Sequence, residues 1–344
     1  MNLTGTAPAG WDDRIEHPLQ SIGFAEASRA LGHRPLFAED DASRALVLVR
    51  RVPIPLVSRW TARAKVYVYA ARPTFLPALA ESLRKLGVSH VRLGDSVWGL
   101  TGDGAAGDLA IRPVTYHLFT HALSTTEDGL LAGMKRTIRR HIRKAADEVT
   151  VSEVRTVADL RAYVSLTAET GERMRFRDVA AVYPPAYFEA IYRAMVPRGQ
   201  AVMFLARARS DAAPLAAGTF VTNGTRFAHI HGCSTRDRLL TPKNGPTAVF
   251  WHAMQYARAC GCQIFDMGAV TPTEDPAHPH HSVYEYKKLW GGELRDLPSG
   301  ELVLAPWKHR FQEFVLSPLW DRCHPLYLRV FGASRARVLA EQHS

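Results

Sequence analysis

The sequence predicts an α/β protein in which one arrangement of strands and helix occurs twice. Three observations support this prediction. In each half of the chain, apolar strands precede a helix, a glycine follows that helix, and another apolar strand follows the glycine. The dipeptide Asn223-Gly224, a strong hairpin signal, joins two of the strands in the second half. The 344 residues are enough for two domains, each with its own core.

In the first half, strands are expected at residues 45–49 and 65–69, a helix at 75–86 and a strand at 88–93. The helix is amphipathic, because its leucines recur at intervals of three or four residues. They are Leu76, Leu79, Leu83 and Leu86. Gly87 follows and is suited to end the helix. These elements form the first copy of the repeat.

The second half repeats this order with strands at 201–206, 214–221 and 226–232. A helix at 247–260 begins after Gly245-Pro246, where a proline is tolerated in the first turn, and ends before Gly261. The last strand of this copy covers 263–268. Helices are also expected at about 157–169 and 185–195.

We therefore expect two tandem α/β domains, covering residues 1–148 and 149–305, with mixed sheets flanked by helices. The active site is expected in the second domain, because only this copy has a long loop, residues 234–245, ahead of its helix. The tail, about 306–344, is rich in tryptophan and arginine. It is expected to form helices that pack back on the first domain.

A basic amphipathic helix is predicted between the two copies, from Glu127 to Glu148, with a capping box at Ser124–Glu127. Its apolar stripe consists of Leu130, Met134, Ile138, Ile142 and Ala145. Its other faces carry Arg136, Arg139, Arg140, Arg143 and Lys144. Clustered cations release counterions from phosphates, which favours an RNA-binding surface. An ordinary solvated helix face is the alternative.

The net charge of +10 also favours polyanionic partners such as RNA, anionic lipid headgroups or phosphorylated substrates. No apolar run reaches the length of a membrane helix, and the N-terminus lacks the pattern of a signal peptide. The four cysteines show no metal-binding spacing and are expected to be reduced thiols. A cytoplasmic protein is expected, with the inner face of the membrane as a further possible location.

The junction before the 247–260 helix is a candidate binding site. Lys243 and Asn244 precede the helix, and free amide groups at a helix N-terminus attract anions. A phosphate or carboxyl group would suit this junction.

The segment from Tyr284 to Gly292 is a second candidate. It is expected to be a strand in which Tyr284, Tyr286 and Lys288 share one face while Lys287 lies on the other. A lysine among Tyr284, Tyr286 and Trp290 could direct its charge at an oxyanion that develops during acyl transfer. The sequence alone does not determine which lysine faces a site.

Asp266 ends an apolar strand and precedes Gly268. It could act as a base or bind a substrate amine, and it could equally cap the following turn. His278-Pro-His-His281 lacks a cysteine or carboxylate that would complete a metal site, so a loop over the site is favoured and no metal is expected.

The order of several motifs resembles the Fem (FemABX-like) family of peptidoglycan interpeptide-bridge transferases, members of the acetyltransferase-like (GNAT) superfamily. Residues 139–145, Arg-Arg-His-Ile-Arg-Lys-Ala, are similar to the family's Arg-x-x-Ile-x-Lys-Ala segment. Residues 265–268, Phe-Asp-Met-Gly, resemble its Tyr-Asp-Phe-Gly strand end. Tyr286-Lys287 and Trp290-Gly291 resemble its Phe-Lys and Phe-Gly pairs. Near the start, Leu31–Pro35 resembles the family's Gly-Trp turn, with His33 in place of the tryptophan.

The resemblance implies two GNAT domains and the transfer of an amino acid from aminoacyl-tRNA to an amine. It implies that Tyr286 and Lys287 stabilise the tetrahedral intermediate. Arg175 or Arg177 would hold phosphates of the acceptor. The family's phosphate-binding lysine falls near Ser28, with Arg29 beside it.

The expected function is therefore an aminoacyl-tRNA-dependent aminoacyltransferase without a cofactor. Its acceptor would be an amine on a cell-wall precursor or peptide natural product, with phosphorylated or lipid-linked forms included. One alternative is an N-acyltransferase that uses a CoA thioester at residues 242–247. Another is a non-catalytic RNA- or membrane-binding protein on the same fold.

Overall fold

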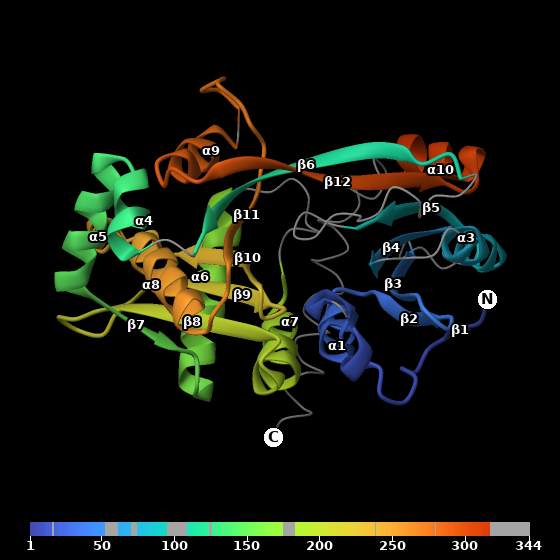
Figure 1. The fold of residues 1–344 in the computed structure, drawn as a ribbon, viewed down its shortest axis with the longest axis horizontal. Helices are drawn as coiled ribbons and strands as arrows, with labels where there is room; N and C mark the ends of the chain where they lie inside the picture. The colour runs from blue at the N-terminus through green and yellow to red at the C-terminus, as the bar shows by residue number, and fades with distance from the viewer. Residues whose placement is uncertain are drawn as a thin grey trace.

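A twelve-stranded mixed sheet runs through both halves of the chain in the computed structural model (Figure 1). The structure describes residues 1–15, 17–51, 61–69, 74–94, 109–123, 126–174, 183–237, 239–278 and 280–316. The strand order is β1-β2-β3-β4-β5-β12-β6-β11-β10-β9-β8-β7. The strands are β1 (Leu3–Thr4), β2 (Arg34–Glu39), β3 (Arg44–Arg51), β4 (Ala62–Tyr69), β5 (Val88–Leu93), β6 (Arg112–Ala122), β7 (Val149–Glu153), β8 (Ala201–Ala208), β9 (Pro214–Thr222), β10 (Arg226–Ser234), β11 (Ile264–Val270) and β12 (Glu293–Val303).

The predicted repeat is present in both halves, and the α/β fold class is confirmed. In the first half β3 and β4 are antiparallel, and helix α3 (Phe75–Lys85) leads from β4 to β5, which is parallel to β4. In the second half β9 and β10 are antiparallel, and helix α8 (Gly245–Ala259) leads from β10 to its parallel neighbour β11. The hairpin predicted at Asn223-Gly224 joins β9 to β10.

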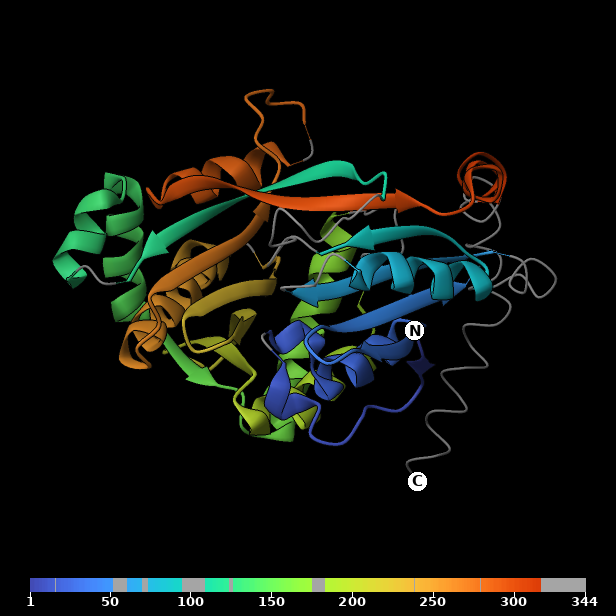
Figure 2. The same ribbon diagram turned by 45° about the vertical axis from the view of Figure 1, so that its right-hand side comes forward.

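The two halves exchange their last strands. After β5, the chain continues into β6, which pairs with β11 of the second half. After β11, it continues into β12, which pairs with β5 of the first half. β6 and β12 also pair with each other along their length, so they join the halves into one sheet (Figures 1 and 2). The expected domain boundary at residue 148 falls after the first of these exchanged strands.

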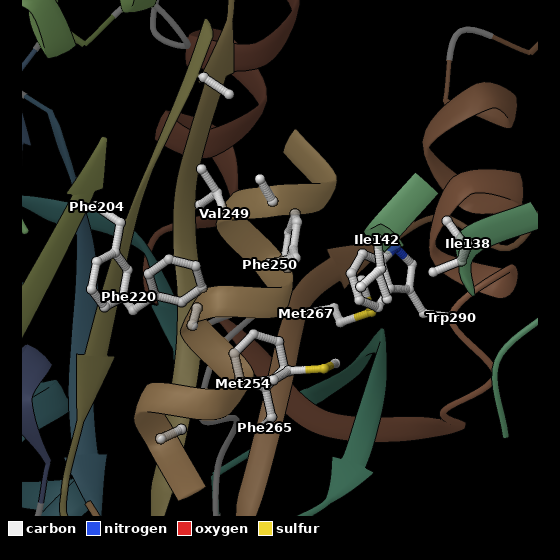
Figure 3. Packing of buried hydrophobic residues seen from close by; sticks show 14 of the residues in the cluster. Ile138, Ile142, Phe204, Phe220, Val249, Phe250, Met254, Phe265, Met267 and Trp290 are labelled. Carbon is white, nitrogen blue, oxygen red and sulfur yellow. The ribbon is translucent and has the colours of Figure 1, made fainter. Parts of the chain in front are cut away.

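Helices cover both faces of the second half. α8 lies over β8, β9 and β10 and packs against α5 (Arg136–Glu148), and Figure 3 shows Phe220, Phe250 and Trp290 in the cluster that they bury. On the other face, α6 (Val157–Met174) packs on β9 and β10. α1 (Ile22–Ala30) packs against α7 (Pro185–Ala190) and the π-helical turn Ile191–Met195 that continues it.

The basic segment between the copies forms two helices, α4 (Glu127–Gly133) and α5, rather than one. Thr126 caps α4, because its side chain accepts a hydrogen bond from the amide of Gly129. Ser124, the expected cap, lies outside the described residues. The predicted apolar stripe is buried as expected: Leu130, Met134, Ile138, Ile142 and Ala145.

The strand predicted from Tyr284 is wrong. Residues His281–Lys288 form helix α9, and the buried positions are Tyr284, Lys287 and Trp290, three residues apart. A period of three to four residues marks a helix face, whereas a strand would alternate. The abundance of aromatic residues favoured a strand locally, but the packing of α9 on β11 overrides that preference.

The start of the tail packs on the first half. Helix α10 (Pro306–Phe311) contacts β5, and Ser89 donates a hydrogen bond of 2.8 Å to Gln312 in the turn that follows (Gln312–Leu316). Residues 317–344 lie outside the described part of the chain. Of the helices that the structure describes, none combines the length and apolar character that a membrane crossing requires.

Candidate active site

The parallel strands β10 and β11 separate part-way along their length. Their ladder pairs Arg226 with Ile264 and Ala228 with Asp266, and it stops there. Beyond this point β10 contains a bulge between His229 and His231, and β11 shifts its pairing with β6 between Asp266 and Ala269. Backbone groups past the last pair are released from the ladder, so the point of separation is the natural place for a ligand.

Gly268 is required at this point. It has φ of +80°, and an added Cβ would lie 2.7 Å from the carbonyl oxygen of His229. Only glycine combines this backbone conformation with so close an approach of the neighbouring strand. The Phe-Asp-Met-Gly motif therefore ends in a residue that the geometry demands.

Lys287 reaches this position from α9. Its side chain is buried, and its ammonium donates hydrogen bonds of 2.8 Å to the carbonyl oxygen of Gly268 and 2.7 Å to that of Ala269. Burial lowers the pKa of Lys287 to about 8, while the nearby carboxylate of Asp266 acts in the opposite direction. An ammonium group has three N–H donors, so two are used by β11 and one has no acceptor among the residues that the structure describes.

The neighbouring lysine has a different environment. Lys288 is exposed and forms ion pairs of 3.2 Å with both Glu274 and Glu285. The structure thus distinguishes the two lysines, and Lys287 is the one that faces the interior.

Asp266 lies beneath Lys287 and is fully buried. Arg226 donates a hydrogen bond to one of its carboxylate oxygens, and the amide of Gly268 donates one of 2.7 Å to the other. Burial raises the pKa of Asp266, and the charge of Arg226 opposes that effect. These contacts suit a residue that holds the Gly268 turn in place, and the role of base stays a prediction.

The aromatic residues of α9 connect it to α8 and the core. The hydroxyl of Tyr286 lies 3.4 Å from that of Thr247 in the first turn of α8, and burial raises the pKa of Tyr286 to about 12. Trp290 is buried against Phe250, with ring centroids 5.8 Å apart. Tyr284 packs against Phe119 of β6. Through its contact with Thr247, Tyr286 connects the helix that carries Lys287 to the start of α8.

A cleft of about 370 Å³ lies at the N-terminus of α8, between the end of β10 and the 234–245 loop. Its lining includes Thr235, Arg236 and Gly245. Asn244 has a left-handed backbone (φ +60°), and its side chain bonds to the carbonyl of Pro242 instead of capping the helix. Lys243 lies 3.9 Å from Glu148 of α5. The first amides of α8 thus have no side-chain cap among the described residues.

The remaining predicted residues lie elsewhere. Arg136, Arg140, Arg143 and Lys144 are exposed on α5, and Arg139 is half-buried. Arg29 is exposed on α1, next to the fully buried Ser28. Arg175 and Arg177 lie outside the described residues.

Two histidines of β10 belong to the site and were not singled out from the sequence. The bulge turns His229 toward Phe250 of α8 and His231 toward Tyr187 of α7, whose hydroxyl is 3.0 Å from its Nε2 atom. Burial, followed by the charge of Lys287, lowers the pKa of His229 to about 3. The sequence does show two histidines within a mostly apolar strand, and this pattern could have drawn attention to them. The bulge that turns their side chains toward different helices could not be predicted from the sequence.

This geometry agrees with a family comparison. A family model described as an acetyltransferase (GNAT) domain matches residues 132–288, which span α5, the separating strands, α8 and Lys287. This half of the chain is therefore similar to an acetyltransferase (GNAT) domain. None of the curated proteins compared with the chain matches it by sequence.

Solved structures extend the likeness beyond residues 132–288. The crystal structure of FemX is similar over 91% of this chain and 100% of its own, with a TM-score of 0.66 and 17% identity. The structure of L-PGS from Bacillus licheniformis is similar over 80% of this chain and 85% of its own, with a TM-score of 0.54 and 13% identity. The likeness to Fem-type transferases expected from the sequence is therefore confirmed for the fold.

Proposed function

We propose that the protein is an aminoacyltransferase that takes an amino acid from aminoacyl-tRNA and forms an amide on an acceptor amine. The observation that carries this proposal is the buried ammonium of Lys287 beside the point where β10 and β11 separate. Its third N–H group is available for the ester carbonyl of the donor. The fold likeness to FemX supports the proposal.

The reaction needs charge stabilisation more than it needs a protein nucleophile. The acceptor nitrogen attacks the ester carbonyl carbon, and a C–N bond forms as the carbonyl oxygen becomes negative. The C–O bond to the tRNA ribose then breaks, and the departing ribose oxygen takes up the proton that the nitrogen loses. Lys287 would stabilise the negative oxygen, because a fixed cation acts strongly in a buried environment.

Tyr286 would help to position the ester carbonyl of the donor beside Lys287. Burial keeps its hydroxyl neutral, so the hydroxyl can donate or accept a hydrogen bond beside the first turn of α8. The exposed basic residues of α5 would contact the phosphates of the donor RNA. With Tyr286 beside α8 and the basic residues on α5, the aminoacyl-tRNA would bind on the face of the sheet that α5 and α8 cover.

The test is to incubate the protein with a pool of radiolabelled aminoacyl-tRNAs and candidate amines, and to follow label into ribonuclease-resistant product. The expected result is product formation that depends on both donor and amine. RNA or liposome binding without an amide product from any donor would contradict the proposal and favour a non-catalytic binding protein.

A CoA thioester is the alternative donor, and the cleft at the start of α8 is the observation that favours it. The uncapped amides there, together with Arg236, suit a pyrophosphate group. Titration with CoA and with charged tRNA separates the two donors. If CoA binds saturably and charged tRNA does not bind, the result would favour acyl transfer from a CoA thioester over aminoacyl transfer.

A further inference from the structure

A second cleft, with a volume of about 490 Å³, lies in the first half of the molecule. It opens on the sheet face opposite α3. Along β3, Val47 and Val49 enter the core cluster that contains the α3 leucines, whereas Leu48 and Arg50 line the cleft. Among the described residues, five cationic side chains line it, contributed by β3, β4, β5 and β6: Arg50, Arg63, Lys65, Arg92 and Arg112.

In this register, positively charged residues on adjacent strands lie directly opposite one another. Arg50 of β3 pairs with Arg63 of β4, and Lys65 of β4 pairs with Arg92 of β5. Like charges that face each other across a sheet destabilise it. A protein retains such pairs at a cost in stability, and an anion bound between them would remove that cost.

Carboxylates neutralise only part of this charge. Glu301 of β12 is buried and binds Arg92 at 2.8 Å as well as Arg112. Burial favours the neutral acid, but hydrogen bonds from these two arginines lower the pKa of Glu301 to about 2, so it stays ionised. Glu313 pairs with Arg63.

The other two cations, Arg50 and Lys65, differ from these arginines. Arg50 and Lys65 have no carboxylate partner in the part of the chain that the structure describes, although the Lys65 ammonium lies 5.0 Å from the centre of the Tyr67 ring. They are the charges left for a ligand.

Histidine side chains complete the wall of the cleft. His90 and His309 stack with ring centroids 4.6 Å apart. The Nδ1 atom of His309 is buried without a hydrogen-bond partner among the described residues. Burial, then the charge of Arg50, lowers the pKa of His33 to about 4. A buried polar atom without a partner is costly in a native protein, so a ligand that hydrogen-bonds to this nitrogen would lower that cost.

We propose that this cleft binds a small phosphorylated molecule that carries at least two negative charges, of the pyrophosphate class. Arginine guanidinium groups suit phosphate oxygens because they offer paired donors in a fixed plane. The volume is that of a small-molecule site rather than a groove for a nucleic-acid duplex. The site lies in the opposite half from Lys287 and does not rest on the proposed transferase reaction.

The test uses inorganic pyrophosphate and the full chain. Isothermal titration calorimetry and thermal unfolding are measured with pyrophosphate and with sodium sulfate at equal ionic strength, for wild type, Lys65→Gln and Lys65→Arg. Lys85→Gln is the matched control, because it removes the same charge from exposed Lys85 on α3, on the other face of the same half. A short single-stranded RNA is titrated in parallel.

Wild type is expected to bind pyrophosphate and to gain thermal stability from it. Lys65→Gln should weaken binding roughly tenfold or more, because a charge-assisted hydrogen bond is lost. It should also raise the melting temperature without ligand, since the repulsion between Lys65 and Arg92 is removed. Lys65→Arg should keep most of the affinity, and Lys85→Gln should behave as wild type.

Three results would overturn the proposal. Sulfate could match pyrophosphate at equal ionic strength, which would indicate general screening. Lys65→Gln could lower the ligand-free melting temperature and leave binding unchanged, which would make Lys65 a structural residue. RNA could bind in a Lys65-dependent manner while pyrophosphate does not, which would assign the cleft to nucleic acid.

Discussion

The ammonium of Lys287 donates a hydrogen bond of 2.8 Å to the carbonyl oxygen of Gly268, across the point where the parallel strands β10 and β11 separate. This hydrogen bond fixes a buried cation on a backbone turn that only glycine can form. It links the two motifs of the second half, Phe-Asp-Met-Gly and Tyr-Lys, which are nearly twenty residues apart in the sequence.

The first prediction concerns the two adjacent lysines. Lys287→Ala should lower the transfer rate at saturating donor by roughly 10²–10³-fold, the effect of removing one oxyanion donor, while donor binding changes little. Lys288→Ala, the matched control, removes an exposed lysine and should retain activity. Rapid-quench kinetics and donor titrations measure the two effects. Equal losses of rate and donor affinity in Lys287→Ala would indicate a structural lysine.

The second prediction is a pH dependence. The pKa of Lys287 is lowered to about 8, so the ammonium is mostly charged at neutral pH and becomes neutral as the pH rises through 8. The transfer rate at saturating substrates should therefore fall above that pH. Lys287→Arg, if active, should lose this alkaline decline, because a guanidinium stays charged throughout the range. Single-turnover rates, corrected for spontaneous ester hydrolysis, give the profile. An identical decline in both proteins would assign it to another group.

The third prediction concerns Gly291 in the Trp-Gly pair. It has φ of +77°, and an added Cβ would lie 1.9 Å from the carbonyl oxygen of Gly133 at the end of α4. Gly291→Ala should therefore lower the free energy of unfolding by about 2–4 kcal/mol. Gly224→Ala is the control, since Gly224 also has positive φ (+86°) but open space around it. Urea denaturation compares them. If both variants lose the same free energy of unfolding, α4 moves away from the added methyl group and only the positive φ is costly.

The fourth prediction tests the buried pair of Asp266 and Arg226. Asp266→Asn should destabilise the protein by about 3–5 kcal/mol, because it removes the fully buried carboxylate charge that pairs with Arg226. Replacing both residues, with Asp266→Asn and Arg226→Met, should cost less than the sum of the single changes. A double-mutant cycle by urea denaturation measures the coupling. Additive costs would mean that the two residues act independently.

The fifth prediction concerns the basic surface of α5. Arg140→Glu combined with Arg143→Glu should weaken tRNA binding and flatten the dependence of affinity on salt, by a slope of roughly one for each phosphate that is no longer bound. Both residues are exposed, so the fold should be unaffected. Arg84→Glu on α3 is the control. Fluorescence anisotropy over a salt series measures the slopes. An unchanged slope would leave α5 as a solvated face.

The sequence by itself determined the repeated order of strands and helix, because that order depends on local patterns. The spacing of Leu76, Leu79 and Leu83 specifies one face of α3, and Asn223-Gly224 specifies a tight turn. The motif resemblance also singled out the segments that contain Lys287 and Gly268, since both segments are short and have a recognisable order. These features need no knowledge of distant parts of the chain.

Only the tertiary structure decided how those pieces meet. Whether residues 281–288 form a helix or a strand depends on what covers them, and this choice selects Lys287 over Lys288 for the interior. The exchange of β6 and β12 and the cationic cleft depend on register between strands far apart in sequence. Local preference is weaker than the burial of a common core, so interactions between distant segments fixed the site.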